Sequence, residues 1–74
     1  MFVEVKLFAT LREGRFKKKQ LELPDGSCLS KLLKHLEIPE KDAKILMVNG
    51  LAVSAGHKLN PSDVVAIFPL VAGG

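Results

Sequence analysis

VVAIF, residues 64–68, is a continuous apolar run, and it predicts a strand with both faces buried. Residues 60–63 (NPSD) come directly before it and are typical of a turn. A strand with two buried faces belongs in the middle of a sheet. We therefore expect a sheet in which residues 64–68 have neighbours on both sides.

One neighbour is predicted at the start of the chain, where residues 2–8 (FVEVKLF) alternate between two faces. The odd-numbered residues form its apolar, core-directed face. Residues 20–23 (QLEL) alternate again, and the connection around Gly14 is of hairpin type. These two segments are expected to pair as antiparallel strands.

A single amphipathic helix is predicted after this hairpin, because the apolar period changes from two to about 3.6 from Ser27 onward. Either Asp25 or Ser27 can supply the N-cap, and Pro39 indicates that the helix has ended. The helix needs an apolar surface to cover. Its apolar face comprises Leu29, Leu32, Leu33 and Leu36.

A second hairpin is predicted at residues 45–53, where ILMV and LAV flank Asn49 and Gly50. Asn-Gly tolerates the positive φ angles of a type I′ turn. We expect these two residues to serve turn chemistry alone.

Five short strands and one helix in this order predict an α+β fold, the ubiquitin-like β-grasp, with a mixed four- to five-stranded sheet. The first and last strands are expected to lie side by side and parallel in the sheet centre, because the helix supplies the crossover that parallel pairing needs. Residues 1–68 form the single domain, and residues 69–74 are expected to be a flexible C-terminal tail.

Composition narrows the classes of function. We expect a chain of 74 residues to form one domain without a deep substrate cavity, which argues against an enzyme that acts by itself. No apolar run spans a bilayer, and one cysteine permits no internal disulfide, so we expect a cytoplasmic protein without a membrane role.

The net charge of +3 is concentrated in residues 12–19 (REGRFKKK). A run of this kind is most often a solvated loop. Nucleic-acid binding ranks below that interpretation, because the chain has no Trp or Tyr on which bases could stack. A third interpretation is contact with an acidic partner surface, which would mainly raise the association rate.

The folded body offers no credible active site. Cys28 and His35 are about 10.5 Å apart along a helix, too far for a nucleophile and its base, so Cys28 is expected to be structural. Metal binding by His35 and His57 has little support, because His57 has no second ligand nearby in the sequence. No metal or bound cofactor is expected. No carboxylate pair is forced together, and no phosphate-binding glycine loop is present.

Attention therefore turns to the tail, residues 69–74 (PLVAGG). These six residues reach at most about 20 Å when extended, which suffices to enter a partner's pocket. Pro69 cannot donate a backbone hydrogen bond, so it is expected to release the tail from the sheet. Gly73 and Gly74 have no side chain, so a narrow channel can admit them. A plain disordered end is the competing interpretation.

The opening KLFATLRE, the segment VNGLAV and the ending HKLNPSDVVAIFPLVAGG together resemble the MoaD/ThiS family of sulfur carriers. The resemblance covers essentially the whole chain and is closest to the small subunit of molybdopterin synthase. Its most specific part is the ending FP-x-V-A-GG after Asp63. Leu70 departs from the common FPP pattern, and the first loop is unusually basic.

The resemblance implies that Gly74 is adenylated by an E1-like enzyme of the MoeB type, which uses ATP, and is converted to a thiocarboxylate. Gly73 matches the penultimate glycine. The tail would then enter a MoaE-like large subunit and supply sulfur for the molybdenum or tungsten cofactor. Alternatives are a carrier for thiamin thiazole or another thio-metabolite, a protein modifier conjugated through Gly74, and a binding module that does not use its terminus.

A partner surface is also expected from the alternation of the two central strands. If Val65 and Ile67 point to the helix, Phe68 faces outward, as do the phenylalanines of the first strand. Such an exposed apolar patch marks an interaction site. The alternative is that one of these phenylalanines folds over the edge of the sheet and forms a small satellite core. The predicted partner-binding residues are Phe2, Phe8, Phe68, Pro69, Leu70, Val71 and Ala72.

Overall fold

The computed structural model describes residues 1–69. Within these residues, five strands and one α-helix follow the order expected from the sequence, and two short 3₁₀ helices were not predicted. The strands are β1 (Phe2–Leu7), β2 (Lys18–Glu22), β3 (Ala43–Val48), β4 (Leu51–Val53) and β5 (Val64–Pro69). The helices are η1 (Ala9–Arg12), α1 (Leu29–His35) and η2 (Glu40–Asp42).

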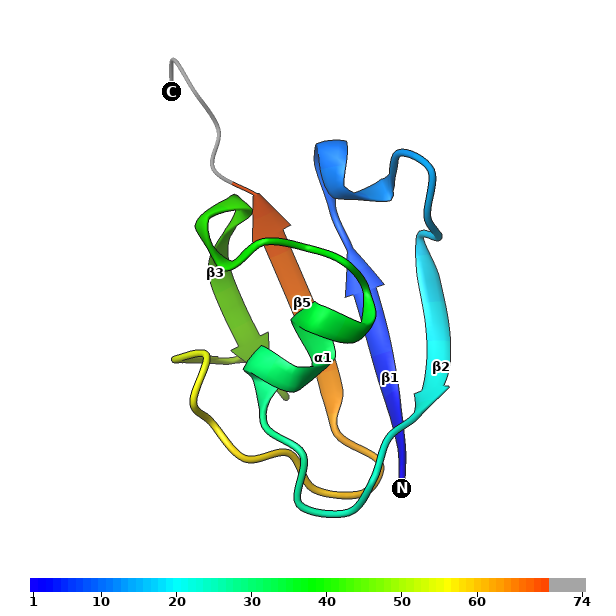
Figure 1. The fold of residues 1–74 in the computed structure, drawn as a ribbon, viewed down its shortest axis with the longest axis vertical. Helices are drawn as coiled ribbons and strands as arrows, with labels where there is room; N and C mark the ends of the chain where they lie inside the picture. Colours follow the sequence, from blue (N-terminus) through cyan, green and yellow to red (C-terminus); the bar gives the residue numbers. More distant parts are fainter. Residues whose placement is uncertain (70–74) are drawn as a thin grey trace.

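The strands form one mixed sheet in the order β2-β1-β5-β3-β4. β5 lies between β1, to which it is parallel, and β3, to which it is antiparallel. β1–β2 and β3–β4 are antiparallel hairpins. The expected central, parallel pairing of the first and last strands is confirmed (Figure 1).

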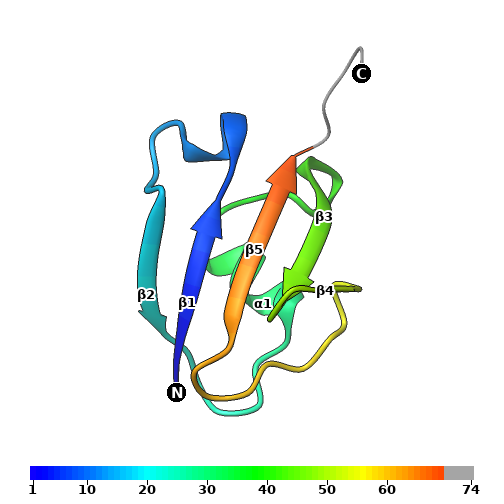
Figure 2. The ribbon, with the colours of Figure 1, turned by 180° about the vertical axis from the view of Figure 1, so that it is seen from behind.

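α1 covers one face of this sheet and leaves the other face open, as the two opposite views show (Figures 1 and 2). Val65 and Ile67 are fully buried under it, so the predicted inward face of β5 is confirmed. Each buried aliphatic side chain of this size contributes about 1.5–3 kcal/mol. The centre of the core comprises Val3, Val5, Leu7, Leu29, Leu32, Leu33, Leu59, Val65 and Ile67.

The N-terminus of α1 differs from the prediction. The N-cap is Cys28, which makes no side-chain capping hydrogen bond, and neither Asp25 nor Ser27 caps the helix. The Ser27 hydroxyl instead donates to the Pro24 carbonyl at 2.6 Å. The loop before β5 satisfies the first amides of the helix: Leu29 N–H donates to the His57 carbonyl at 3.0 Å, and Ser30 N–H donates to the carbonyl of residue 55 at 2.8 Å. A tertiary contact has replaced the local cap that the sequence indicated.

The C-terminus of α1 is closed by a Schellman motif. Ile38 N–H donates to the Leu33 carbonyl at 2.9 Å, and Glu37, at φ 59°, takes the left-handed position that usually carries glycine. Arg15 crosses from the first loop and donates to the carbonyls of Leu36 and Glu37 at 3.2 and 3.1 Å. Part of the basic segment is therefore structural, because it satisfies the open carbonyls of the helix end.

Two strand boundaries also differ from the prediction. β2 begins at Lys18, so the end of the lysine run lies in a strand rather than in a solvated loop. β5 continues through Pro69, which is paired with Ala43. The predicted type I′ turn is confirmed, since Asn49 and Gly50 have φ angles of 52° and 84°.

Candidate functional site: the end of β5 and the outer face of the sheet

Two aromatic side chains stack at the C-terminal end of β5, one from β5 itself and one that follows β1. The Phe8 and Phe68 rings stack with their centroids 4.3 Å apart and their planes 12° from parallel. The parallel register of β1 and β5 brings these two residues together, and Phe8 N–H donates to the Ile67 carbonyl at 3.2 Å. The predicted site residues Leu70, Val71, Ala72, Gly73 and Gly74 lie outside the residues that the structure describes.

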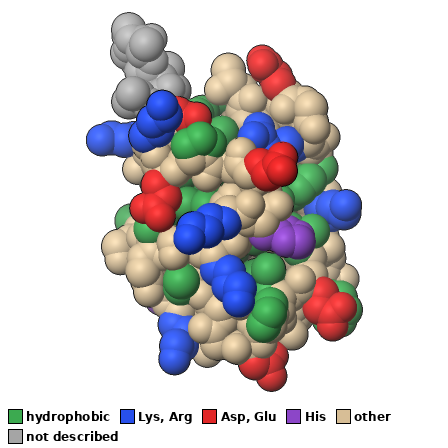
Figure 3. Space-filling view, viewed as in Figure 1, with side chains coloured by type: hydrophobic (Ala, Val, Ile, Leu, Met, Phe, Trp, Pro, Cys, Tyr) green, Lys and Arg blue, Asp and Glu red, His purple; other side chains and the backbone are tan. Residues whose placement is uncertain are grey.

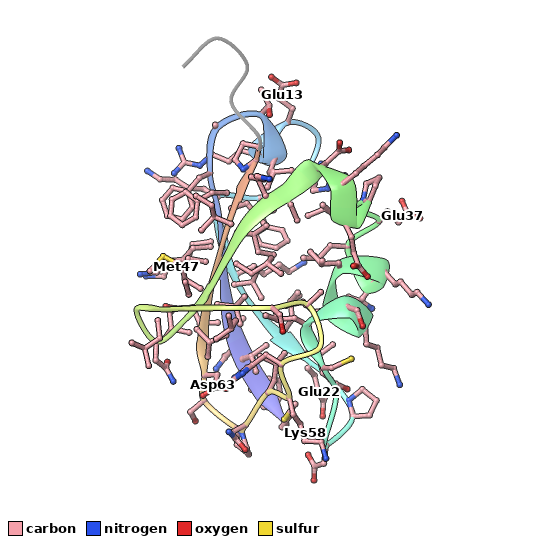
Figure 4. All side chains as sticks on the ribbon, turned by 90° about the vertical axis from the view of Figure 1, so that its left-hand side faces the viewer. Glu13, Glu22, Glu37, Met47, Lys58 and Asp63 are labelled. Atoms are coloured by element: carbon pink, nitrogen blue, oxygen red, sulfur yellow. The ribbon has the colours of Figure 1, made fainter. Side chains whose placement is uncertain are left out.

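Around this pair, apolar side chains gather on the face of the sheet opposite α1. Ile45 lies directly across from Phe68, and Met47 lies directly across from Ala66. Ile45 is 48% exposed, and Met47 is seen on the side of the sheet away from α1 (Figure 4). We call this surface the outer patch. It consists of Phe8, Ile45, Met47, Ala66 and Phe68.

Phe2 is separate from this cluster. It is 52% exposed and pairs with Glu22 at the start of β1, whereas Phe8 follows the end of that strand. Six residues of strand place the two phenylalanines about 20 Å apart. The structure thus brings together two of the three aromatic side chains predicted for the partner surface.

A basic hollow adjoins the outer patch and shares Phe8 with it. It has a volume of about 270 Å³. The Arg12 guanidinium lies over the Phe8 ring, 5.4 Å from its centroid, while its Nε donates to the Leu7 carbonyl at 2.7 Å. The lining residues are Lys6, Phe8, Arg12, Lys17 and Lys18.

The other end of β5 is fixed by Asn49 and Asp63. The Asn49 amide donates to the Asp63 carboxylate at 2.9 Å and accepts from Val64 N–H at 2.9 Å. Asp63 is 7% exposed and also accepts from Asn60 N–H at 2.8 Å. The expectation that Asn49 serves only its turn is wrong, because its side chain also holds the first residue of the strand that leads to the tail.

The Cys28 thiol has a lowered pKa but no catalytic partner among the residues that bond to it. Its Sγ lies 3.0 Å from the Ser30 hydroxyl, and this hydrogen bond, helped by the Lys31 backbone N–H, lowers the pKa of the thiol below its ordinary value. No histidine is among its hydrogen-bond partners in residues 1–69. Across that same range, no three His, Cys, Asp or Glu side chains are grouped to hold a metal ion, and no helix is long and apolar enough to cross a membrane.

The face that carries α1 differs from the outer patch. Lys, Arg, Asp and Glu side chains alternate over it with only small hydrophobic areas between them (Figure 3). Mixed charges of this kind are typical of a solvated surface. Among the described residues, the outer patch and the basic hollow beside it are therefore the better candidates for recognition.

This sheet order, wrapped on a single helix, defines the ubiquitin-like β-grasp class. The chain belongs to the ThiS family: the family model matches residues 5–74, nearly the whole chain. A search of curated proteins found no match.

Solved structures agree with this assignment. A Pyrococcus furiosus protein proposed to be subunit 1 of molybdopterin converting factor is 30% identical, with a TM-score of 0.75 over 96% of this chain and 99% of its own. SAMP1 from Haloferax volcanii is 24% identical, with a TM-score of 0.77, and each chain is fully covered. The complex of subunits 1 and 2 of molybdopterin-converting factor from Helicobacter pylori contains a match that is 24% identical, with a TM-score of 0.65 and full coverage of both chains. The last two likenesses bear on the fold alone.

Proposed function

We propose that this protein is a sulfur carrier whose C-terminal Gly74 receives sulfur as a thiocarboxylate and delivers it during molybdopterin synthesis. The observation that carries the proposal is the family match, which extends through Gly74 itself. The 30% identity to the Pyrococcus protein favours the molybdopterin branch of the family. In this role the chain is the small subunit and does not catalyse the reaction by itself.

The chemistry follows from the nature of a C-terminal carboxylate, which is ionised at neutral pH and is a poor electrophile. An E1-like adenylyltransferase activates it: a carboxylate oxygen attacks the α-phosphate of ATP, and pyrophosphate leaves. A hydrosulfide ion then attacks the acyl carbon, so that a C–S bond forms, the C–O bond to AMP breaks, and loss of the thiol proton leaves the thiocarboxylate. The chain supplies the substrate carboxylate, and ATP is bound by the partner enzyme.

The outer patch is the proposed contact with these partners. Phe68, which stacks on Phe8, is followed directly by Pro69, so a protein that covers this pair contacts the chain where the tail begins. Aromatic side chains at the centre of an interface commonly provide much of the binding energy. In this proposal a second, larger subunit accepts the tail, and the Helicobacter pylori structure is a complex of subunits 1 and 2 of such a factor.

Intact-mass measurement tests the carrier role directly. The protein is isolated from its native cells, or is incubated with the E1-like enzyme of those cells, ATP and a sulfur donor. We expect a mass increase equal to the exchange of one oxygen for one sulfur. Because Cys28 is the only cysteine, a Cys28→Ser variant that still reacts once with iodoacetamide carries its reactive sulfur at the terminus.

A variant that lacks Gly73 and Gly74 is the matched control, and it must show no sulfur loading. Unloaded protein under conditions that load a known family member would contradict the proposal. Lysine-linked adducts of Gly74 in place of the thiocarboxylate would identify a protein modifier, a role that the same fold permits. Rescue of thiamin auxotrophy, rather than of molybdenum-enzyme activity, would instead identify a carrier for the thiazole branch.

A further inference from the structure

The basic hollow contains an arrangement that costs stability. Lys6 of β1 and Lys18 of β2 are direct cross-strand partners, and like charges at such positions repel one another. Lys17 and Arg12 line the same hollow of about 270 Å³. Four cationic side chains thus converge on one small concave surface.

Little within the described chain neutralises these charges. In residues 1–69, the only side-chain carboxylate within 4.0 Å of a lysine or arginine nitrogen is that of Glu4, at 3.8 Å from Lys18 Nζ. Lys6, Arg12 and Lys17 therefore have no carboxylate at ion-pair distance in that part of the chain. A ligand that brings negative charge would relieve the repulsion between Lys6 and Lys18.

Phe8, the apolar residue that lines the hollow, already has neighbours on its ring, and this limits the kind of ligand that can bind there. Phe68 stacks on the Phe8 ring, and the Arg12 guanidinium also lies over that ring. Single-stranded nucleic acids need free aromatic faces on which bases stack. Because Phe8 already contacts Phe68 and Arg12, its remaining apolar surface suits an aliphatic side chain in van der Waals contact.

We infer that the basic hollow docks an acidic protein segment in which carboxylates flank an aliphatic side chain. The inference rests on the proposed function in one respect: the segment belongs to the protein that accepts the tail. The hollow is continuous with the outer patch through Phe8, which lies beside the end of β5. A partner covering the patch therefore meets the hollow in the same encounter.

A short peptide tests the docking chemistry without an identified partner. The probe is acetyl-Glu-Glu-Leu-Glu-Glu-amide, titrated into the ¹⁵N-labelled protein at low salt and followed by NMR. We expect saturable shifts at the amides of residues 6–12 and 17–18. The corresponding peptide with Gln in place of Glu should not bind, and added salt should weaken binding because the contacts are partly exposed.

Two variants of equal net charge separate a specific hollow from general attraction. Lys6→Gln/Lys17→Gln/Lys18→Gln removes three lining cations and should weaken binding about tenfold, as expected from three exposed ion pairs. Lys34→Gln/Lys41→Gln/Lys58→Gln removes three exposed lysines elsewhere and should leave the affinity unchanged. Equal weakening by both variants, or no saturable binding, would overturn the inference.

Competition by a nucleic acid and peptide binding by the tail-truncated variant test the remaining alternatives. If an oligothymidine strand binds more tightly than the peptide and displaces it, the hollow is a nucleic-acid site and the inference is wrong. The variant lacking Gly73 and Gly74 should bind the peptide normally, because the probe does not need the tail. Peptide binding by a protein that never loads sulfur would refute only the proposed function, whereas sulfur loading without peptide binding would refute only the docking site.

Discussion

Replacement of Asn49 tests how the strand that leads to the tail is anchored. The Asn49 side chain makes two hydrogen bonds of 2.9 Å, one to the carboxylate of Asp63 and one from Val64 N–H. Its backbone also has a φ of 52°, in the left-handed region. Asn49→Gly removes only the side-chain bonds, whereas Asn49→Ala removes them and adds backbone strain.

The expected loss of stability follows from these contacts. A neutral hydrogen bond contributes about 0.5–1.5 kcal/mol and one to a charged group about 1.5–3 kcal/mol. Because the bond from Val64 N–H is exposed, we expect Asn49→Gly to lower the free energy of unfolding by about 2–3 kcal/mol. Asn49→Ala should lose about 1 kcal/mol more, since residues with a Cβ are disfavoured at positive φ.

Urea unfolding monitored by circular dichroism measures the loss of unfolding free energy in both variants, and thermal unfolding measures the melting temperature. A domain of this length is stable by about 4–11 kcal/mol, so Asn49→Gly should remain folded with a melting temperature about 10–20 °C lower. The control is Asn60→Ala, which keeps the backbone N–H that Asp63 accepts and should change stability by less than about 0.5 kcal/mol. If Asn49→Gly matched the parent protein within that margin, the side-chain bonds would not anchor β5.

Two other predictions concern the surface. Phe68→Ala and Phe8→Ala should each weaken binding to the large subunit, as measured by calorimetry, but leave the domain folded, because the half-buried stacked pair contributes only about 0.5–1.5 kcal/mol beyond its buried area. Loss of the folded spectrum would instead place these rings in the core. Phe2→Ala tells whether the partner covers the whole outer face. Ser30→Ala should raise the pKa of the Cys28 thiol toward its ordinary value, because the Ser30 hydroxyl is the main cause of the lowering. The pH at which iodoacetamide alkylation of Cys28 reaches half its maximal rate measures this, and an unchanged midpoint would contradict the assigned cause.

The elements with a clear period could be predicted from the sequence. Alternation over residues 2–8 placed β1 and its buried face, and the spacing of Leu29, Leu32 and Leu33 placed α1. Asn49-Gly50 placed the second hairpin, because few residue pairs tolerate two consecutive positive φ angles. These signals are local, so a single sequence contains them in full.

The features that could not be predicted depend on contacts between distant segments. The α1 amides bond to the loop around His57, and Arg15 bonds to the helix end, although neither residue has a local pattern that shows it. Ile45 and Met47 lie in an uninterrupted apolar run, which hides the face to which each residue points. The phenylalanines of the outer patch could be predicted from alternation, whereas the contribution of Ile45 and Met47 depends on the pairing of β3 with β5.

The anchoring of β5 links these contacts to the proposed role. The strand has neighbours along both edges, and Asn49 and Asp63 fix its first residue, so little of its backbone is free to open locally. A partner that binds the outer patch therefore meets a surface that is already formed, and association loses little free energy to ordering. Asn49→Gly should then lower stability without moving Phe8 or Phe68 in the folded state, whereas Phe68→Ala should lower partner affinity with a small effect on stability. If one of these variants lowered both the stability and the partner affinity strongly, the outer patch and the anchor of β5 would be energetically coupled, contrary to this prediction.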